Sequence, residues 1–230
     1  MRLKPELEKF LTMQDLDDIF VARRSLKPLD STDIDTVIAI LSQWNTPQAI
    51  ANLLFYPNTI PATVRSQSIL KGLHENDCIY YRLAAIVGLQ SLNASDFTAI
   101  EVEQIRDRLI SLIASDRGII SARASVSIAS YLQANDVDLI IPLLNHPGDL
   151  VKHNILVTLI ELVGVDRIRD LIDSAAQAKK ISEEAVTFCQ AKFSQVLELS
   201  NNSVTGVPFE SSNLSLPMLS HIPNLKDIMG

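Results

Sequence analysis

The stretch from Val137 to Leu159 reads VDLIIPLLNHPGDLVKHNILVTL, and it decides the fold. Its first half is an apolar run that ends in paired leucines, Leu143 and Leu144, where a short helix is expected. His146-Pro147-Gly148 then interrupts the run with residues typical of a turn. A second apolar run opens with Val151-Lys152. The stretch therefore predicts two antiparallel helices joined by a short turn.

A similar phrase recurs along the chain: a helix-breaking turn, a small or β-branched residue, a base and a run of small apolar residues. Self-similarity of this kind is typical of stacked helix pairs and not of a single closed enzyme core. The spacing is irregular, because Arg123 and Lys152 are 29 residues apart whereas Arg65 and Arg82 are only 17 apart. One of the latter two helices therefore cannot hold the equivalent position. The four copies are Asn58–Leu73, Asp77–Leu92, Ser115–Leu132 and His146–Leu162.

The composition favours an all-helical protein. The 230 residues are 47% hydrophobic, which is enough for a sizeable core, and only 7 are glycine, the residue that turns and phosphate loops require. Apolar residues recur at helical spacing, and no convincing strand pattern interrupts them. Helices are expected over Met13–Leu26, Ile34–Leu41, Pro47–Tyr56, Ala62–Leu73, Cys78–Leu92, Thr98–Ala114, Ile119–Leu132, Val137–Leu144, Leu150–Val163, Val165–Ala178 and Ser182–Leu199.

The pattern divides the chain into three parts. We expect an N-terminal segment over 1–13, a helical repeat domain over 14–199, and a polar linker with an apolar C-terminal tail over 200–230. The tail carries apolar residues close to helical spacing, among them Ile222 and Leu225. It either covers an exposed end of the stack, as solenoid ends require, or is a short motif for another protein.

The phrases resemble HEAT repeats, in which a first helix ending in paired leucines meets an Asp-Pro-type turn and a second helix opening with Val-Arg. Val137–Leu159 carries this resemblance, and Ala49–Leu73 shows it with a longer turn. The small-residue stretches Arg82-Leu83-Ala84-Ala85-Ile86 and Arg123-Ala124-Ser125 are most similar to the phycobilin-lyase type of HEAT repeat found in cyanobacterial proteins. The resemblance covers residues 14–199 and implies an all-α, HEAT-like α-solenoid of stacked antiparallel helix pairs.

Two functions follow from this resemblance. Members of that family attach or remove bilins on phycobiliproteins, take part in phycobilisome turnover, or serve as adaptors, some of them for iron-sulfur scaffold proteins. No fixed catalytic motif defines the family, so the resemblance transfers no catalytic residue. Our leading hypothesis is a non-enzymatic adaptor for another protein, such as a phycobiliprotein or an iron-sulfur scaffold protein. The alternative is a bilin lyase-like protein that attaches, removes or handles phycobilin.

The recurring base has two interpretations. Arg65, Arg82, Arg123 and Lys152 could line a concave face that binds acidic groups such as bilin propionates or an acidic partner. Alternatively each base hydrogen-bonds a carboxylate or carbonyl of a neighbouring turn, where Asp77, Asp116 and Asp149 are available. We favour this ladder. The candidate residues for binding a partner or ligand are Tyr80, Arg82, Arg123, Lys152 and His153.

Aromatic residues are the other candidates for partner contacts. Tyr80-Tyr81 and Trp44 could anchor a partner, although packing between helices is the favoured role. Two adjacent tyrosines cannot both face the core from one helix, so one of them is expected to be partly exposed.

Other site chemistries are not expected. Cys78 and Cys189 lie apart without Cys-x-x-Cys spacing, which argues against a zinc site, and Cys189 fits the apolar face of its helix. Motifs for acyl transfer and phosphate loops do not occur in the sequence. We therefore expect no metal, no cofactor and no catalytic residue.

Charge and hydropathy bound the partners and the compartment. The net charge of -7 argues against nucleic acid, because phosphate binding depends on clustered Lys and Arg. No secretory signal pattern is visible near Met1, and charge or proline breaks every apolar run well before about 20 residues. Two cysteines cannot form a disulfide framework, which fits a reducing compartment. We expect a soluble cytoplasmic protein.

Overall fold

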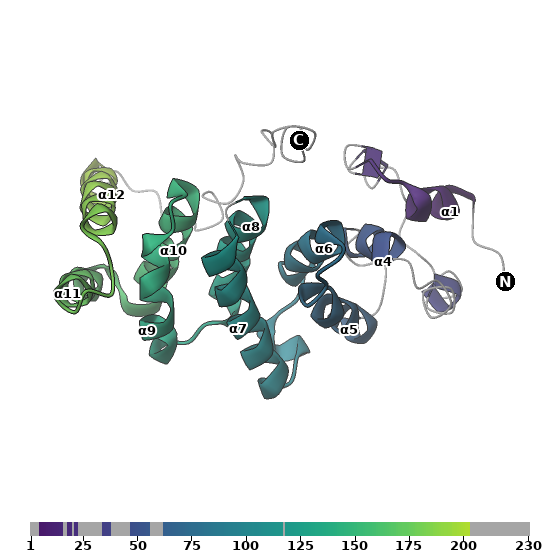
Figure 1. Ribbon diagram of the computed structural model, residues 1–230, viewed down its shortest axis with the longest axis horizontal. Helices are drawn as coiled ribbons and strands as arrows, with labels where there is room; N and C mark the ends of the chain where they lie inside the picture. The colour runs from purple at the N-terminus through teal and green to yellow at the C-terminus, as the bar shows by residue number, and fades with distance from the viewer. Residues whose placement is uncertain are drawn as a thin grey trace. The chain divides into compact units, whose positions relative to one another are not determined.

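The computed structural model describes residues 5–15, 18–19, 21–22, 34–37, 47–55, 62–116 and 118–202. The chain divides into two compact units, Met1–Cys189 and Gln190–Gly230, and the packing described below lies within the first. Over these ranges every regular element is an α-helix or a 3-10 helix (Figure 1), so the predicted all-α class is confirmed. The expectations for Trp44 and for the tail beyond Asn202 fall outside the described residues.

The helix bounds follow the prediction from Pro47 onward. The helix α1 was not anticipated, because the sequence analysis treated residues 1–13 only as a segment. The elements are α1 (Pro5–Thr12), α4 (Pro47–Leu54), α5 (Ala62–Leu73), α6 (Ile79–Leu89), η1 (Ala94–Asp96), α7 (Ala99–Ser115), α8 (Ile119–Ser127), η2 (Ile128–Tyr131), η3 (Ala134–Asp136), α9 (Val137–Ile140), η4 (Ile141–Asn145), α10 (Asp149–Val163), α11 (Val165–Gln177) and α12 (Glu183–Asn202).

The starts of two helices show how the local sequence sets these bounds. Helix α4 begins at Pro47, where the missing N–H of proline would have no helical partner in any case. Helix α7 begins after Thr98, whose Oγ1 accepts from the N–H of Glu101 at 3.3 Å. The carboxylate of Glu101 accepts in return from the Thr98 N–H at 2.7 Å, and these hydrogen bonds lower the pKa of Glu101.

Two predicted helices change type along their length. The helix expected over Val137–Leu144 is α-helical only to Ile140 and continues as the 3-10 helix η4. Pro142 explains the change, because it has no N–H to donate and its ring clashes with the carbonyl four residues earlier in an α-helix. The helix expected over Ile119–Leu132 likewise ends as the 3-10 helix η2. At the other end, α12 continues past the predicted end at Leu199.

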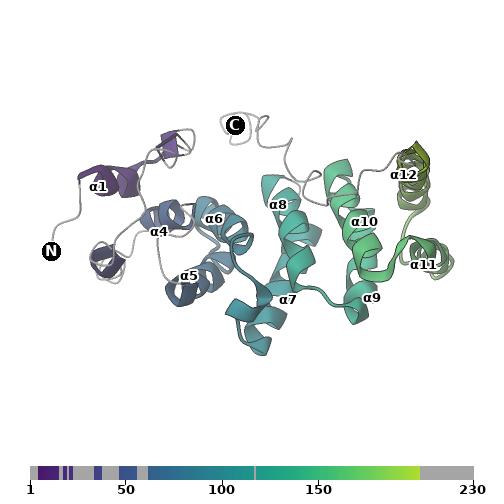
Figure 2. The same ribbon diagram turned by 180° about the vertical axis from the view of Figure 1, so that it is seen from behind.

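Helices that alternate in sequence pack side by side. Helix α4 contacts α6, α6 contacts α8, and α8 contacts α10; we call these four the even helices (Figures 1 and 2). Helix α5 contacts α7, and α7 contacts η4, so the elements between the even helices form a second row. The side chains between the rows are apolar and buried, such as Ile86, Ile105, Leu109 and Ile155. Their burial supplies the main stabilisation.

Polar side chains link successive helix pairs near their turns. Arg108 Nε donates to the carbonyl of Leu73 at the end of α5, at 2.8 Å. His146 Nε2 lies 3.0 Å from the carbonyl of Asp116, and its Nδ1 accepts from the N–H of Gly148 at 2.9 Å. An acceptor at Nδ1 means that the proton of the neutral ring is on Nε2, which donates to Asp116. The next link is Asn145, which donates to the carbonyl of Lys180 at 2.9 Å.

A second series of polar links joins the even helices directly. Ser127 Oγ on α8 donates to the carbonyl of Ile86 on α6 at 3.0 Å. Asn154 on α10 donates to Ser125 Oγ on α8 at 3.0 Å. Each link satisfies a polar group inside the packing, so neighbouring helices are held in a defined register.

Candidate functional site

The five candidate residues lie on three consecutive even helices. Tyr80 and Arg82 are on α6, Arg123 is on α8, and Lys152 and His153 are on α10. The contacts of their side chains divide them into two groups. Tyr80, Arg82 and Lys152 are held within the packing, whereas Arg123 and His153 lie on a surface that the described helices leave uncovered.

Tyr80 belongs to a buried polar cluster between α6 and α4. Its hydroxyl donates to Oδ1 of Asn52 at 2.9 Å, and its ring lies 5.4 Å from that of Phe55. Burial raises the pKa of Tyr80, although a hydrogen bond with Gln48 opposes the shift. Tyr81 is fully buried while Tyr80 is partly exposed, so the prediction that the pair cannot both face the core is confirmed.

Asn52 is the centre of this cluster, and the sequence analysis did not single it out. The side chain is fully buried, and its Nδ2 lies 2.8 Å from the carbonyl of Phe10, 3.3 Å from that of Leu11 and 3.0 Å from that of Met13. These carbonyls are at the end of α1, where the supply of helical N–H donors ends, and the Phe10 carbonyl also accepts from the Met13 N–H at 3.3 Å. Asn52 therefore caps α1 from the neighbouring helix α4.

Arg82 binds the turn that precedes its own helix. Its Nε donates to the carbonyl of Glu75 at 2.7 Å, and its Nη2 donates to that of Asn76 at 3.2 Å. Arg65 lies on α5, the first helix of the same pair, and its Nη1 donates to Ser91 Oγ at 3.2 Å. The prediction that Arg65 and Arg82 cannot hold equivalent positions is therefore confirmed.

Lys152 joins α10 to α12. Its Nζ lies 3.0 Å from the carboxylate of Asp149 and 3.2 Å from that of Glu184, and 4.8 Å from the centre of the Phe188 ring. Burial lowers the pKa of Lys152, but the hydrogen bonds and attraction to the two carboxylates outweigh burial and raise it. The side chain is only 5% exposed, so this ammonium is a structural contact and is not presented to solvent.

Arg123 and His153 lie on one face of the row of even helices. On α8, Ser127 contacts α6 and Ser125 contacts α10, and Arg123 lies on the arc of the helix between these two contacts. On α10, His153 lies between Asn154, which contacts α8, and Lys152, which contacts α12. Both side chains are half-buried. Arg123 makes no hydrogen bond or ion pair with any residue in the described part of the chain.

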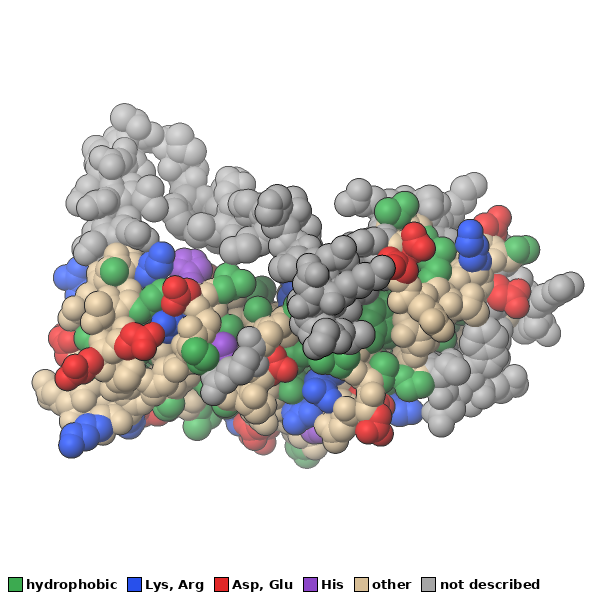
Figure 3. Space-filling model, turned by 45° about the horizontal axis from the view of Figure 1, so that its top comes forward, with side chains coloured by type: hydrophobic (Ala, Val, Ile, Leu, Met, Phe, Trp, Pro, Cys, Tyr) green, Lys and Arg blue, Asp and Glu red, His purple; other side chains and the backbone are tan. Residues whose placement is uncertain are grey.

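Large apolar side chains share this surface with them. Ile79 on α6 is 50% exposed, Val126 on α8 is 47% exposed and Leu150 on α10 is 40% exposed. Hydrophobic side chains are visible at the surface in Figure 3 among Lys, Arg, His, Asp and Glu side chains. We call this surface the open face. Its residues are Ile79, Val87, Ala122, Arg123, Val126, Leu150, His153 and Val157.

The open face also differs in charge from the rest of the chain. Helices α6 and α8 contain no Asp or Glu, and each contains one arginine. The whole chain has a net charge of -7, so its excess of carboxylates lies elsewhere. The α6 and α8 part of the open face is therefore an apolar surface with a cationic group, whereas α10 adds Asp149, an exposed carboxylate beside Leu150 that is paired with Lys152 at 3.0 Å.

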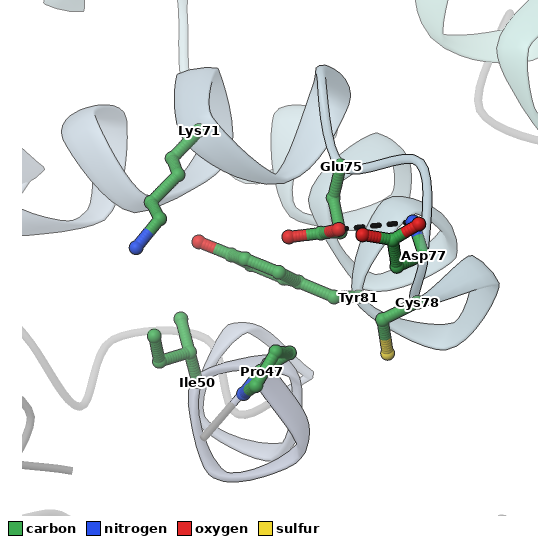
Figure 4. Close-up of a pocket in the computed structure, with 7 residues that line it drawn as sticks. All are labelled: Pro47, Ile50, Lys71, Glu75, Asp77, Cys78 and Tyr81. Atoms are coloured by element: carbon green, nitrogen blue, oxygen red, sulfur yellow. Dashed lines mark hydrogen bonds between the residues drawn. The ribbon is translucent and has the colours of Figure 1, made fainter. Parts of the chain in front are cut away.

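A shallow pocket of about 410 Å³ lies beside Tyr81, between α4 and the turn that joins α5 to α6 (Figure 4). Lys71 points toward the Tyr81 hydroxyl, and Glu75 and Asp77 lie at the other end, where the Asp77 N–H donates to the Glu75 carboxylate at 3.0 Å. The pocket thus holds charges of both signs. Its lining residues include Cys78 but no histidine that could act as a base.

The two cysteines differ in burial. Cys189 is fully buried, as predicted, and burial raises the pKa of its thiol to about 11. Cys78 precedes the first residue of α6 and is partly exposed. Among the residues that the structure describes, no cluster of His, Cys, Asp and Glu could hold a metal ion. Over the same part of the chain, no helix has the length and hydropathy needed to cross a membrane.

Comparison with known proteins does not assign the chain to a family. No protein-family model, no curated protein and no solved structure matches it.

Proposed function

We propose that the chain is a non-enzymatic protein-binding scaffold. The observation that carries the proposal is the open face, which exposes Ile79, Val126 and Leu150 on three consecutive even helices. Large apolar side chains exposed on one surface of a domain are typical of a site for a partner protein. The candidate residues Arg123 and His153 lie on the same face and add polar contacts to it.

The proposed architecture is a HEAT-like α-solenoid of stacked antiparallel helix pairs. The contacts of α4, α6, α8 and α10 in order support it, because a solenoid element contacts only its neighbours along the stack. Three of the polar links also have similar separations in sequence: 29 residues separate Ser125 and Asn154, 30 separate Asp116 and His146, and 32 separate Lys152 and Glu184. These separations resemble one short repeat.

The partner classes follow from the resemblance to phycobilin-lyase-type HEAT repeats. A phycobiliprotein or an iron-sulfur scaffold protein is the first to test, with each purified partner titrated into the chain by calorimetry. Val126→Glu should abolish binding, because it places a charge in the apolar part of the face. Ile100→Glu on α7 is the matched control, because Ile100 is 69% exposed and lies off the open face. Equal affinities of the two variants would contradict the proposed site.

The second candidate function is handling of a bilin chromophore. Arg123 favours it, because an unpaired guanidinium beside apolar side chains suits a propionate group on a flat hydrophobic molecule. Mixing the purified protein with a bilin tests this function by the visible absorption spectrum. A shifted band that is lost in Arg123→Gln would support it, and an unchanged spectrum would reject it.

A further inference from the structure

We infer that the open face binds an amphipathic segment of another protein that carries carboxylates beside its apolar side chains. The inference rests on the proposed scaffold function and names the chemistry of the partner. Three features of the described helices carry it: the exposed apolar side chains, the charge of the face, and the unpaired Arg123.

The apolar side chains require an apolar counterpart. Val126 and Leu150 lie on helices that pack against each other, and Ser125 and Asn154 join these helices at 3.0 Å. Burying such side chains against apolar groups of a partner is favourable. A partner helix or extended segment with apolar residues on one side could cover both.

The charge of the face selects carboxylates. Helices α6 and α8 offer arginines and no acidic residue, so a partner carboxylate would meet no like charge on either helix. On α10 the exposed carboxylate of Asp149 is paired with Lys152 at 3.0 Å, so its charge is balanced within the helix. Arg82 is already bonded to two turn carbonyls, but Arg123 has no partner in the described part of the chain. A half-buried guanidinium forms stronger hydrogen bonds to a carboxylate than to a neutral acceptor.

The net negative charge of the chain does not prevent a partner carboxylate from binding at Arg123. Charges farther away than about 8–10 Å are screened at physiological salt, whereas a carboxylate bonded to Arg123 is in direct contact. A lysine-bearing partner would gain nothing at Arg123 and would leave the guanidinium unpaired against a like charge.

Designed peptides test the partner chemistry on the full wild-type chain. Three peptides share leucines at helical spacing and differ only in carrying Glu, Gln or Lys at the remaining positions. We expect the Glu peptide to bind at least about threefold more tightly than the Gln peptide, and the Lys peptide to bind most weakly. Equal affinities of the three peptides, or tighter binding of the Lys peptide, would overturn the inference.

Two variants locate the effect. Arg123→Gln should remove the preference for Glu over Gln, and Arg123→Lys should retain part of it. Arg167→Gln is the matched control, because Arg167 on α11 is exposed and lies off the open face. If Arg123→Gln melts at a lower temperature, the comparison of the three peptides on the wild-type chain still decides. Retention of the full preference in a folded Arg123→Gln chain would overturn the inference.

A photo-crosslinking residue identifies the occupant of the face. In the full chain, Val126→p-benzoylphenylalanine should crosslink to the Glu peptide. A crosslink to a second copy of the chain, or to its own C-terminal segment 203–230, in place of the peptide would overturn the inference. A crosslink to a protein without an acidic amphipathic segment would overturn the partner chemistry but leave the scaffold function standing. No crosslink to any protein would count against both.

Discussion

Replacing Asn52 by alanine is the sharpest test of how this fold is held together. The side chain is fully buried on α4, and it caps the last carbonyls of α1, more than 35 residues earlier in the sequence. Asn52→Ala removes the donor for these carbonyls and the acceptor for the hydroxyl of Tyr80. The mutation therefore acts on three elements at once.

The expected loss can be worked out from the contacts. An amide has two N–H hydrogens, so Nδ2 can make two strong hydrogen bonds, and the distances favour the carbonyls of Phe10 at 2.8 Å and Met13 at 3.0 Å. The carbonyl of Met13 keeps a weaker bond from Gln48 at 3.3 Å after the mutation. The carbonyl of Phe10 likewise keeps the N–H of Met13 at 3.3 Å. Asn52→Ala thus removes two short hydrogen bonds, worth about 0.5–1.5 kcal/mol each, and takes the acceptor on Asn52 from the partly exposed Tyr80 hydroxyl, which costs about 1 kcal/mol more. We therefore expect a loss of about 2–4 kcal/mol in unfolding free energy.

Hydrogen exchange and denaturation measure this loss at two scales. Amides of α1 should exchange about thirtyfold faster or more in Asn52→Ala, because their opening free energy falls by the same amount. The midpoint of urea unfolding, followed by circular dichroism, should fall without a change in slope. Asn135→Ala is the matched control, because Asn135 is exposed in η3. Tyr80→Phe, which removes the hydrogen bonds of this hydroxyl with Asn52 and Gln48, should cost about 0.5–1.5 kcal/mol for each hydrogen bond.

Asn52→Asp separates the hydrogen bonds from the packing. An ionised carboxylate has nearly the same shape but cannot donate, and it would face the carbonyls of Phe10 and Met13. We expect it to destabilise the chain at least as much as alanine does. If Asn52→Ala and Asn52→Asp both shift the unfolding free energy by less than about 0.5 kcal/mol, the cap does not hold α1, and the reasoning is refuted.

Three further predictions follow from buried contacts. Gly72→Ala should lower the unfolding free energy by about 1–3 kcal/mol in urea, because its added Cβ would lie 2.7 Å from the Tyr81 ring; a gain in stability would show that the ring moves aside. The raised pKa of Lys152 means that its charge stabilises the fold at neutral pH and that this contribution disappears only above the ordinary lysine range. In Glu184→Gln, the unfolding free energy measured over a pH series should fall less steeply at alkaline pH than in the wild-type chain. The same pH dependence in both chains would contradict the ion pair. Buried Cys189 should resist a thiol reagent in the native chain and react only after unfolding, whereas two fast-reacting thiols would contradict its burial.

The helices were predictable because their signals are local. Pro47 at the start of α4 and the Thr98 and Glu101 pair at the start of α7 act within one turn of chain, so the sequence alone locates both helices. Helix α1 has local signals as well, with Pro5 at its first position and the buried Leu7, Phe10 and Leu11 at helical spacing, but its cap comes from a distant residue. Its carbonyls are satisfied by Asn52 on α4, and no pattern within residues 1–13 indicates that partner.

The open face could be predicted only in part. The sequence indicates Arg123 and His153 as polar residues near the start of a helix. The structure places both on a surface that the described helices leave uncovered. Val126 could not be chosen in the same way, because α8 buries small residues such as Ala124 and Ser125 and exposes a larger apolar one. Since α8 buries serines together with Ile120 and Ala124 and exposes Val126, periodicity does not indicate which residues face solvent.

The recurring base shows why a repeated residue need not have a repeated role. The recurring base lies near the start of its helix in each of three cases, Arg82, Arg123 and Lys152, yet its contacts differ from one helix to the next. Arg82 bonds backward to its own turn, Lys152 bonds across to Glu184 on α12, and only Arg123 has no partner within the described chain. The direction in which each side chain leaves its helix decides between these outcomes. If Arg123 is the base that serves recognition, a charge-neutral change there should alter binding more than folding, and the same change at Lys152 should do the reverse.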